Sequence, residues 1–145
     1  HIVVSFNSSN SSGTKVKKYI NGTQITATTS ADPSYTSFGR NSSTSRIGAR
    51  VDGPGLSVAQ QFKGYLAEVH FIDGQELDPY FFGEMRNNIW IPYNAFTTAN
   101  SNSVVSRASN GNTAYDNYGS NGFHLLFDDA TNFGKDSSGK NNDWS

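Results

Sequence analysis

The sequence has no cysteine and a single methionine, and charged residues make up only 16% of its 145 positions. The absence of cysteine excludes a disulfide framework, a thiolate metal site and a cysteine nucleophile. A formal net charge of −1 gives no electrostatic basis for binding nucleic acid or an anionic membrane. No apolar run approaches the roughly 20 residues that cross a bilayer, and no signal peptide is visible. We therefore predict neither a nucleic-acid partner nor a membrane partner.

What the sequence does contain favours β-structure. Aromatic residues make up 13% of the chain, there are 14 glycines, and Ser, Thr and Asn fill about a third of the positions. This mixture is typical of turns and short strands rather than helices. The length suits one domain of ordinary size, and the start at His1 rather than Met leads us to expect a piece of a longer product. The composition therefore predicts an all-β fold.

The first strands are predicted near the N-terminus. Residues 1–6 form a short β-branched run, and two further β-prone runs cover residues 15–20 and 23–27. Asn21 and Gly22 separate these two runs, and Asn-Gly is the preferred pair for a type I′ turn because both central residues need a positive φ. The pattern predicts a β-hairpin over residues 15–27.

The middle of the chain combines strands with one short helix. Residues 45–50 are predicted as a short strand, and an Asp-Gly-Pro-Gly turn follows at 52–55. The alternation over residues 61–72 predicts the longest strand, with both faces covered or with a bulge that shifts its phase. Asp78 as N-cap before Pro79 predicts a helix over residues 79–85, and residues 88–92 are expected to be extended.

The amino-acid composition of the chain changes beyond residue 92. Residues 93–120 are rich in Asn, Ser, Ala, Thr and Tyr, which is typical of a linker or an extended arm. Residues 122–127 form a clear apolar strand. A polar turn over residues 136–144 follows it.

Three carboxylates are the nearest candidates for acid–base catalysis. A retaining glycosidase needs two carboxyl groups about 5–5.5 Å apart. Glu68, Asp73 and Glu76 are the closest set, but Glu68 and Asp73 are separated by an odd number of residues and so point to opposite faces of a strand. We expect Glu68 to be an acceptor that ties its strand to a neighbouring loop, and we predict that the protein is not an enzyme.

The histidines and the C-terminal aspartates are the candidates for metal binding. His70 and His124 lie within predicted strands without a serine or a second histidine at useful spacing, so we interpret both as structural or surface residues. Asp128, Asp129 and Asp136 can supply oxygen ligands for Ca²⁺, but no dense D-x-D-x-D loop is present. We predict no cofactor and no metal site, and keep calcium at these aspartates as the alternative.

Aromatic residues outside the patterned strands are the candidate contact residues. If exposed, they would contact a glycan or a protein partner as large rigid groups; if buried, they would fill the space between a sandwich and the arm. We expect Trp90 to be buried because it lies between Ile89 and Ile91. For the tyrosines both alternatives stay open. The candidate glycan or partner contacts are Trp90, Tyr93, Tyr115 and Tyr118.

Several of these motifs together resemble a known family. The order of residues 16–20, Asn21-Gly22, Arg46-Ile47-Gly48 and the F-x-G-x-L-x-E-V pattern of residues 62–69 is similar to the C-terminal half of the concanavalin A-like lectin/glucanase superfamily, in its laminin-G-like branch. The extension through residues 71–79, 82–84 and 90–92 resembles a version found in bacteriophage virion and tail-fibre proteins. The pieces at residues 119–123, 136–139 and 142–144 resemble the continuation of the same phage proteins.

The resemblance implies part of an antiparallel jelly-roll β-sandwich. Residues 1–92 would be the C-terminal part of the jelly roll, residues 93–121 a linker or assembly arm, and residues 122–145 the first strand and turn of a following β unit. The N-terminal half of the sandwich would be absent from the chain, so open strand edges would have to be paired by other chains.

The function that the resemblance implies is assembly. The chain would be a non-catalytic structural module of a larger phage virion protein, in a capsid decoration, tail or fibre, with other chains of the particle as partners. A lectin-like module that binds host or surface glycans is the first alternative. A fragment of a glycoside hydrolase is the second.

Overall fold

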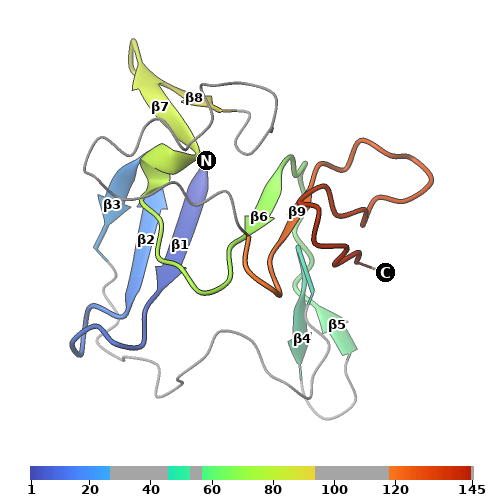
Figure 1. The fold of residues 1–145 in the computed structure, drawn as a ribbon, viewed down its shortest axis with the longest axis horizontal. Helices are drawn as coiled ribbons and strands as arrows, with labels where there is room; N and C mark the ends of the chain where they lie inside the picture. The colour runs from blue at the N-terminus through green and yellow to red at the C-terminus, as the bar shows by residue number, and fades with distance from the viewer. Residues whose placement is uncertain (27–45, 53–56, 94–117, 145) are drawn as a thin grey trace.

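The computed structural model describes residues 1–26, 46–52, 57–93 and 118–144, and the all-β prediction is confirmed in these ranges (Figure 1). They form small antiparallel sheets and one short 3-10 helix. None of the helical structure in these ranges has the length and apolar character needed to cross a membrane.

The N-terminal sheet has three antiparallel strands in the order β1-β2-β3: β1 Ile2–Phe6, β2 Val16–Ile20 and β3 Thr23–Ile25. The predicted hairpin is confirmed, because Asn21 and Gly22 have φ angles of 47° and 77°, as the two central residues of a type I′ turn require. The predicted first strand is confirmed as well.

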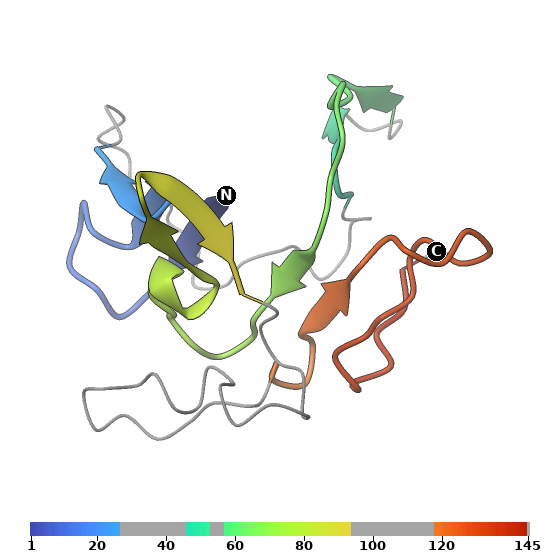
Figure 2. The same ribbon diagram turned by 90° about the horizontal axis from the view of Figure 1, so that it is seen from above.

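A two-stranded sheet joins the middle of the chain to its C-terminal part. β6 Val69–Phe71 pairs antiparallel with β9 Phe123–Leu125, so that the predicted strand at residues 122–127 is confirmed over its first half. Phe127, with a φ of 59°, departs from strand geometry. Both views show β6 and β9 to one side of the N-terminal sheet (Figures 1 and 2). The predicted linker at residues 93–121 is described only at Tyr93 and at residues 118–121.

The predicted helix is shorter than expected. The 3-10 helix η1 covers Pro79–Phe81, and Asp78 caps it as predicted by accepting a hydrogen bond from the Tyr80 N–H. The prediction of helix to residue 85 is wrong, because β7 Gly83–Arg86 pairs with β8 Ile89–Pro92. Asn87 and Asn88 both have a positive φ and make the tight turn between these strands.

The prediction of a strand from residue 61 is wrong over its first eight positions. Residues 61–68 lie outside the strands and are exposed, with Tyr65 fully so. Glu68 has a φ of 53°, which breaks the extended backbone immediately before β6. The predicted strand at residues 45–50 is displaced, because the structure begins β4 Arg50–Asp52 at its last residue and pairs it with β5 Ser57–Ala59. The predicted turn between them lies at residues 53–55, outside the described residues.

The buried apolar side chains lie in and just before β9 and on either side of η1. They are Leu77, Phe82, Tyr118, Phe123 and Leu125. Asp73, in the turn after β6, holds the residues before β9 in place: its N–H donates to the Tyr118 carbonyl at 2.9 Å, and its carboxylate accepts from the Asn121 side chain at 2.8 Å. The small core therefore lies beside the strand pair that positions the candidate site.

The N-terminal sheet has one face turned toward the rest of the chain and one exposed apolar face. Ser5 and Lys17 lie on the inner face and contact Glu76. On the opposite face the register places the half-buried Phe6 and Val16 and four more exposed apolar side chains. Their exposed fractions are 75% for Ile2, 52% for Val4, 47% for Ile20 and 41% for Ile25.

Candidate functional site

Two histidines from distant parts of the sequence lie side by side at the β6–β9 pair. His70 is directly opposite His124 in the register, and their rings stack with centroids 4.1 Å apart. Glu68 lies two residues before His70, and one donor atom from each of the three side chains falls within 4.8 Å of the others. The interpretation that neither histidine has a second histidine at useful spacing is therefore wrong, because strand pairing supplies the neighbour.

Tyr118 holds the histidine pair from the side of the core. Its hydroxyl lies 2.9 Å from His70 Nδ1, and its ring stacks with both imidazoles at centroid distances of 6.1 Å. Tyr118 is only 2% exposed. This hydrogen bond fixes the orientation of the His70 ring.

Burial keeps the three aromatic groups of this cluster uncharged at neutral pH. It lowers the pKa of His70 to about 3, with a further contribution from His124. Burial also lowers the pKa of His124, although the carboxylates of Glu68, Asp136 and Asp128 oppose that shift. Burial raises the pKa of Tyr118 above its ordinary range. Two neutral imidazoles are therefore available as nitrogen donors.

One nitrogen of the cluster has no hydrogen-bond partner. His124 is 6% exposed, and its Nε2 is buried without a donor or acceptor within reach among the described residues. Leaving a buried polar atom unpaired costs about 1–3 kcal/mol. Such an atom in a native structure calls for an explanation, and ion binding is one of the usual ones.

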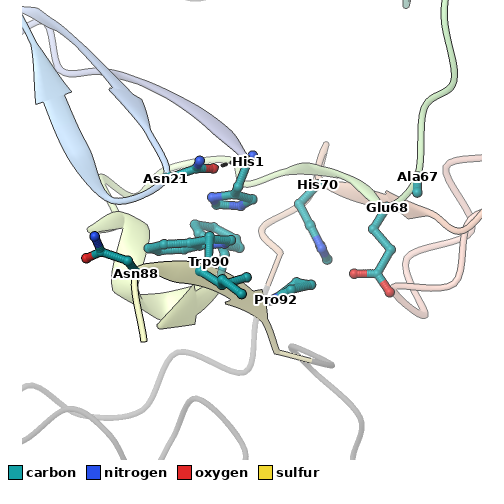
Figure 3. A pocket seen from close by; sticks show the side chains of 10 residues that line it. His1, Asn21, Ala67, Glu68, His70, Asn88, Trp90 and Pro92 are labelled. Atoms are coloured by element: carbon teal, nitrogen blue, oxygen red, sulfur yellow. Dashed lines mark hydrogen bonds between the residues drawn. The ribbon is translucent and has the colours of Figure 1, made fainter. Parts of the chain in front are cut away.

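A pocket of about 650 Å³ adjoins the cluster, with Glu68 and His70 on one side and His1 and Trp90 on the other. Figure 3 shows His70 and Glu68 extending into the same space. It also shows the His1 ring lying over Trp90, where the two rings stack with centroids 4.9 Å apart. Asn21 and Asn88 add polar amide groups to the lining.

Trp90 is half-buried in the hairpin β7–β8. It stacks on His1, and Tyr80 lies against it at a centroid distance of 5.6 Å. The close approach of Gly22 beneath the ring explains part of this burial, because a Cβ on Gly22 would lie 2.5 Å from Trp90 Cζ3. The N-terminal hairpin and β8 therefore position the indole together.

The other candidate contact residues do not gather with Trp90. Tyr93 is half-buried, and its N–H donates to the Phe82 carbonyl at 2.9 Å. For Tyr118 the sequence left burial and exposure open; the structure buries it, so it offers no surface contact. Tyr115 lies outside the described residues.

Two of the three carboxylates considered for catalysis, Glu76 and Asp73, have structural contacts. Glu76 forms an ion pair with Lys17 at 2.7 Å and accepts a hydrogen bond from Asn7 at 2.9 Å. The hydrogen bond from Lys17, followed by that from Asn7, lowers the pKa of Glu76. Asp73 accepts from Asn121. For Glu68, no hydrogen bond to a loop is present among the described residues.

Two of the aspartates considered as calcium ligands, Asp136 and Asp129, accept hydrogen bonds from nearby residues. Asp136 is buried, and its carboxylate accepts hydrogen bonds from the backbone of His124, Ser138 and Asn142 and from the Ser138 hydroxyl. Burial opposes ionisation of Asp136, but these hydrogen bonds outweigh it and lower the pKa. Asp129 accepts from Thr131, and within the described ranges neither it nor Asp128 joins a cluster of potential ligands.

Comparisons of the chain with protein-family models, with curated proteins and with solved structures find no match.

Proposed function

We propose that the chain is a non-catalytic β-module of a larger phage virion protein, and that it works through contacts with neighbouring chains. The observation that carries the proposal is the exposed apolar face of the sheet β1-β2-β3. An antiparallel sheet that exposes an apolar face typically packs that face against a second layer. The jelly-roll sandwich that the family resemblance implies would supply such a second layer.

The partner surface is an apolar β-face that carries a carboxylate and belongs to a different chain. Lys18 lies on the same face, opposite Val4 in β1 and Ile25 in β3, and is exposed. A symmetric contact between two copies would bring like charges together at Lys18, whereas a partner carboxylate would pair with it. Charge complementarity therefore favours a second virion chain over another copy.

Zero-length carboxyl–amine cross-linking of assembled particles, followed by mass spectrometry, tests the proposal. We expect Lys18 to cross-link to an acidic residue of another virion chain, while exposed Lys140, on the C-terminal turn, gives no such link. A cross-link from Lys18 to the same chain, to a second copy, or to no residue at all would overturn the proposal.

Carbohydrate binding is the second candidate, favoured by the pocket beside Trp90. Its aromatic wall and the amides of Asn21 and Asn88 combine an apolar surface with a few polar groups, as ligand pockets do. A glycan array tests it: we expect binding that Trp90→Ala and Asn88→Ala remove. An array without a hit excludes this candidate and leaves the assembly proposal standing.

A further inference from the structure

The cluster of Glu68, His70 and His124 has a donor set that the assembly proposal does not use. Two imidazole nitrogens and a carboxylate oxygen form one of the ligand combinations that bind Zn²⁺. Glu68 and His70 lie just before and within β6, and His124 lies at the centre of β9. The pairing of these two strands places the histidines opposite each other. The backbone therefore sets two of the three donors before any ion binds.

The second observation that points to a ligand is the unpaired nitrogen of His124. Its Nε2 is buried, the side chain is more than nine-tenths buried, and no described group satisfies it. A neutral imidazole nitrogen without a hydrogen bond has a lone pair or an N–H that remains unsatisfied. A metal ion would satisfy the lone pair and remove this cost.

The spacing of the donors is compatible with a small divalent ion. Tetrahedral zinc with bonds of about 2.0–2.1 Å places its ligand atoms roughly 3.3 Å apart. The three donors, within 4.8 Å of one another, must close by about 1.5 Å at most to reach this spacing. Glu68 is exposed and can rotate toward the histidines, and the stacked rings need only tilt about their side-chain bonds.

Tyr118 supports the same interpretation. Histidine ligands commonly hydrogen-bond through the ring nitrogen that does not bind the metal, which fixes the ring and its tautomer. Nδ1 of His70 lies 2.9 Å from the Tyr118 hydroxyl, and in the tautomer in which Nδ1 donates this hydrogen bond, Nε2 is the ligand nitrogen. The pocket beside Glu68 and His70 provides a path by which an ion reaches the cluster.

We propose that Glu68, His70 and His124 form a zinc site at the wall of this pocket, with Tyr118 orienting His70. Three protein ligands leave the fourth position of the ion open to water or to a group from outside the chain. Nitrogen donors favour zinc over calcium, which takes oxygen ligands. The site is independent of the assembly proposal, because none of its residues lies on the apolar face of the N-terminal sheet.

Isothermal titration calorimetry of the EDTA-treated chain with zinc chloride at pH 7.5 tests the proposal. We expect one zinc ion per chain with micromolar or tighter affinity. His70→Gln and His124→Gln should each weaken binding by about 100-fold, and Glu68→Gln by about 10-fold. His1 is the remaining histidine of the chain, and His1→Gln is the matched control that should change the affinity less than about twofold.

Imidazole resonances in nuclear magnetic resonance spectra give a second measurement that does not depend on variants. We expect zinc to shift the resonances of His70 and His124 and to leave those of His1 in place. His124→Gln alters a buried side chain, so its fold is checked by circular dichroism. If His124→Gln unfolds, the zinc affinity of the Glu68→Gln variant, which changes an exposed residue, and the imidazole resonances of the wild type test the proposal. Zinc shifts confined to His1, or full zinc affinity in Glu68→Gln together with unshifted His70 and His124, would overturn the proposal.

Discussion

Lys17 in β2 lies 2.7 Å from Glu76 in the segment that follows β6, and this ion pair fastens the N-terminal sheet to the middle of the chain. Glu76 also accepts a hydrogen bond from Asn7 at 2.9 Å and one from Asn10 at 3.4 Å. Both side chains of the pair are partly shielded from solvent, with exposed fractions of 33% and 23%. Together with the Ser5 hydroxyl, this makes four polar groups of the N-terminal region that bind this one carboxylate in the segment before η1.

Replacing Glu76 by glutamine should destabilise the fold by about 1–2 kcal/mol, because one charged acceptor of several hydrogen bonds is lost. Urea denaturation at pH 7 measures the free energy of unfolding. Asp128→Asn is the matched control, since it also removes one carboxylate but from an exposed position. It should change the stability by less than about 0.5 kcal/mol. Equal effects of the two variants would contradict the structural role of Glu76.

The same ion pair predicts a pH dependence of stability. The hydrogen bonds from Lys17 and then Asn7 lower the pKa of Glu76 below its ordinary value of 4.5, and the hydrogen bond from Glu76 raises the pKa of Lys17. A carboxylate with a depressed folded-state pKa stabilises the fold fully above its unfolded-state pKa. This contribution is lost as the pH falls through the folded-state value.

Denaturation of the wild type and of Glu76→Gln between pH 7 and pH 3 tests this dependence. The difference in unfolding free energy between the two proteins should be constant from pH 7 to about pH 5 and shrink below about pH 4. Taking the difference removes the contributions of Asp129 and Asp136, whose pKa values are also lowered. A difference that stays constant down to pH 3 would show that the charge of Glu76 is irrelevant.

Local signals in the sequence predicted the turns and several strands. Asn21-Gly22 fixed the hairpin because the backbone there needs two positive φ angles, and Asp78-Pro79 marked the start of η1. The prediction of helix beyond Phe81 is wrong because Gly83 belongs to a strand that packs closely against β8. A Cβ on Gly83 would lie 2.6 Å from the Ile91 carbonyl oxygen. Asn87-Asn88 carried a signal for this second hairpin, since asparagine tolerates positive φ.

The candidate metal site could not be predicted from spacing, because strand pairing assembles it. His70 and His124 belong to strands that are far apart in the sequence, and nothing local predicts that they pair. Each histidine sits between two apolar residues, in Val-His-Phe and Phe-His-Leu, and this shared pattern was the available signal. The alternation over residues 61–72 predicts Glu68 within a strand, whereas the structure places it before β6 with a positive φ and next to the histidines.

The C-terminal turn depends on Asp136. Its carboxylate accepts hydrogen bonds from His124, Ser138 and Asn142, and Asp136 donates its own N–H to Asp143 at 2.8 Å. Asp136→Asn should cost about 2 kcal/mol because an amide nitrogen replaces one buried acceptor oxygen. Asp143→Asn removes the charge from an exposed acceptor of one hydrogen bond and should cost about 1 kcal/mol or less.

Amide hydrogen exchange distinguishes this local effect from general loosening. In Asp136→Asn, the N–H groups of His124, Ser138 and Asn142 should exchange faster by a larger factor than the amides of β1 and β2. A uniform acceleration over the whole chain would contradict a local role for Asp136.

Gly22 is required both by the turn and by Trp90. Its φ of 77° lies in the left-handed region, and a Cβ would lie 2.5 Å from Trp90 Cζ3 and 3.2 Å from the Tyr80 ring. Gly13 is the matched control: its φ of 84° is equally unfavourable for alanine, but no atom lies within 4 Å of its Cβ position. Gly13→Ala should cost about 1 kcal/mol from backbone strain alone. Gly22→Ala should cost at least about 1 kcal/mol more, because the indole must also move.

Thermal and urea denaturation give the two free energies, and tryptophan fluorescence reports the indole directly. We expect Gly22→Ala to shift the emission of the wild type and Gly13→Ala to leave it unchanged, with Trp144, the second tryptophan, as a constant background in both variants. In a Trp90→Ala background, Gly22→Ala should cost less stability than in the wild type, because the indole that the new Cβ approaches is absent. The cost that remains is the backbone strain. Equal costs for the two glycine variants, with no change in emission, would mean that Trp90 does not pack on the hairpin turn.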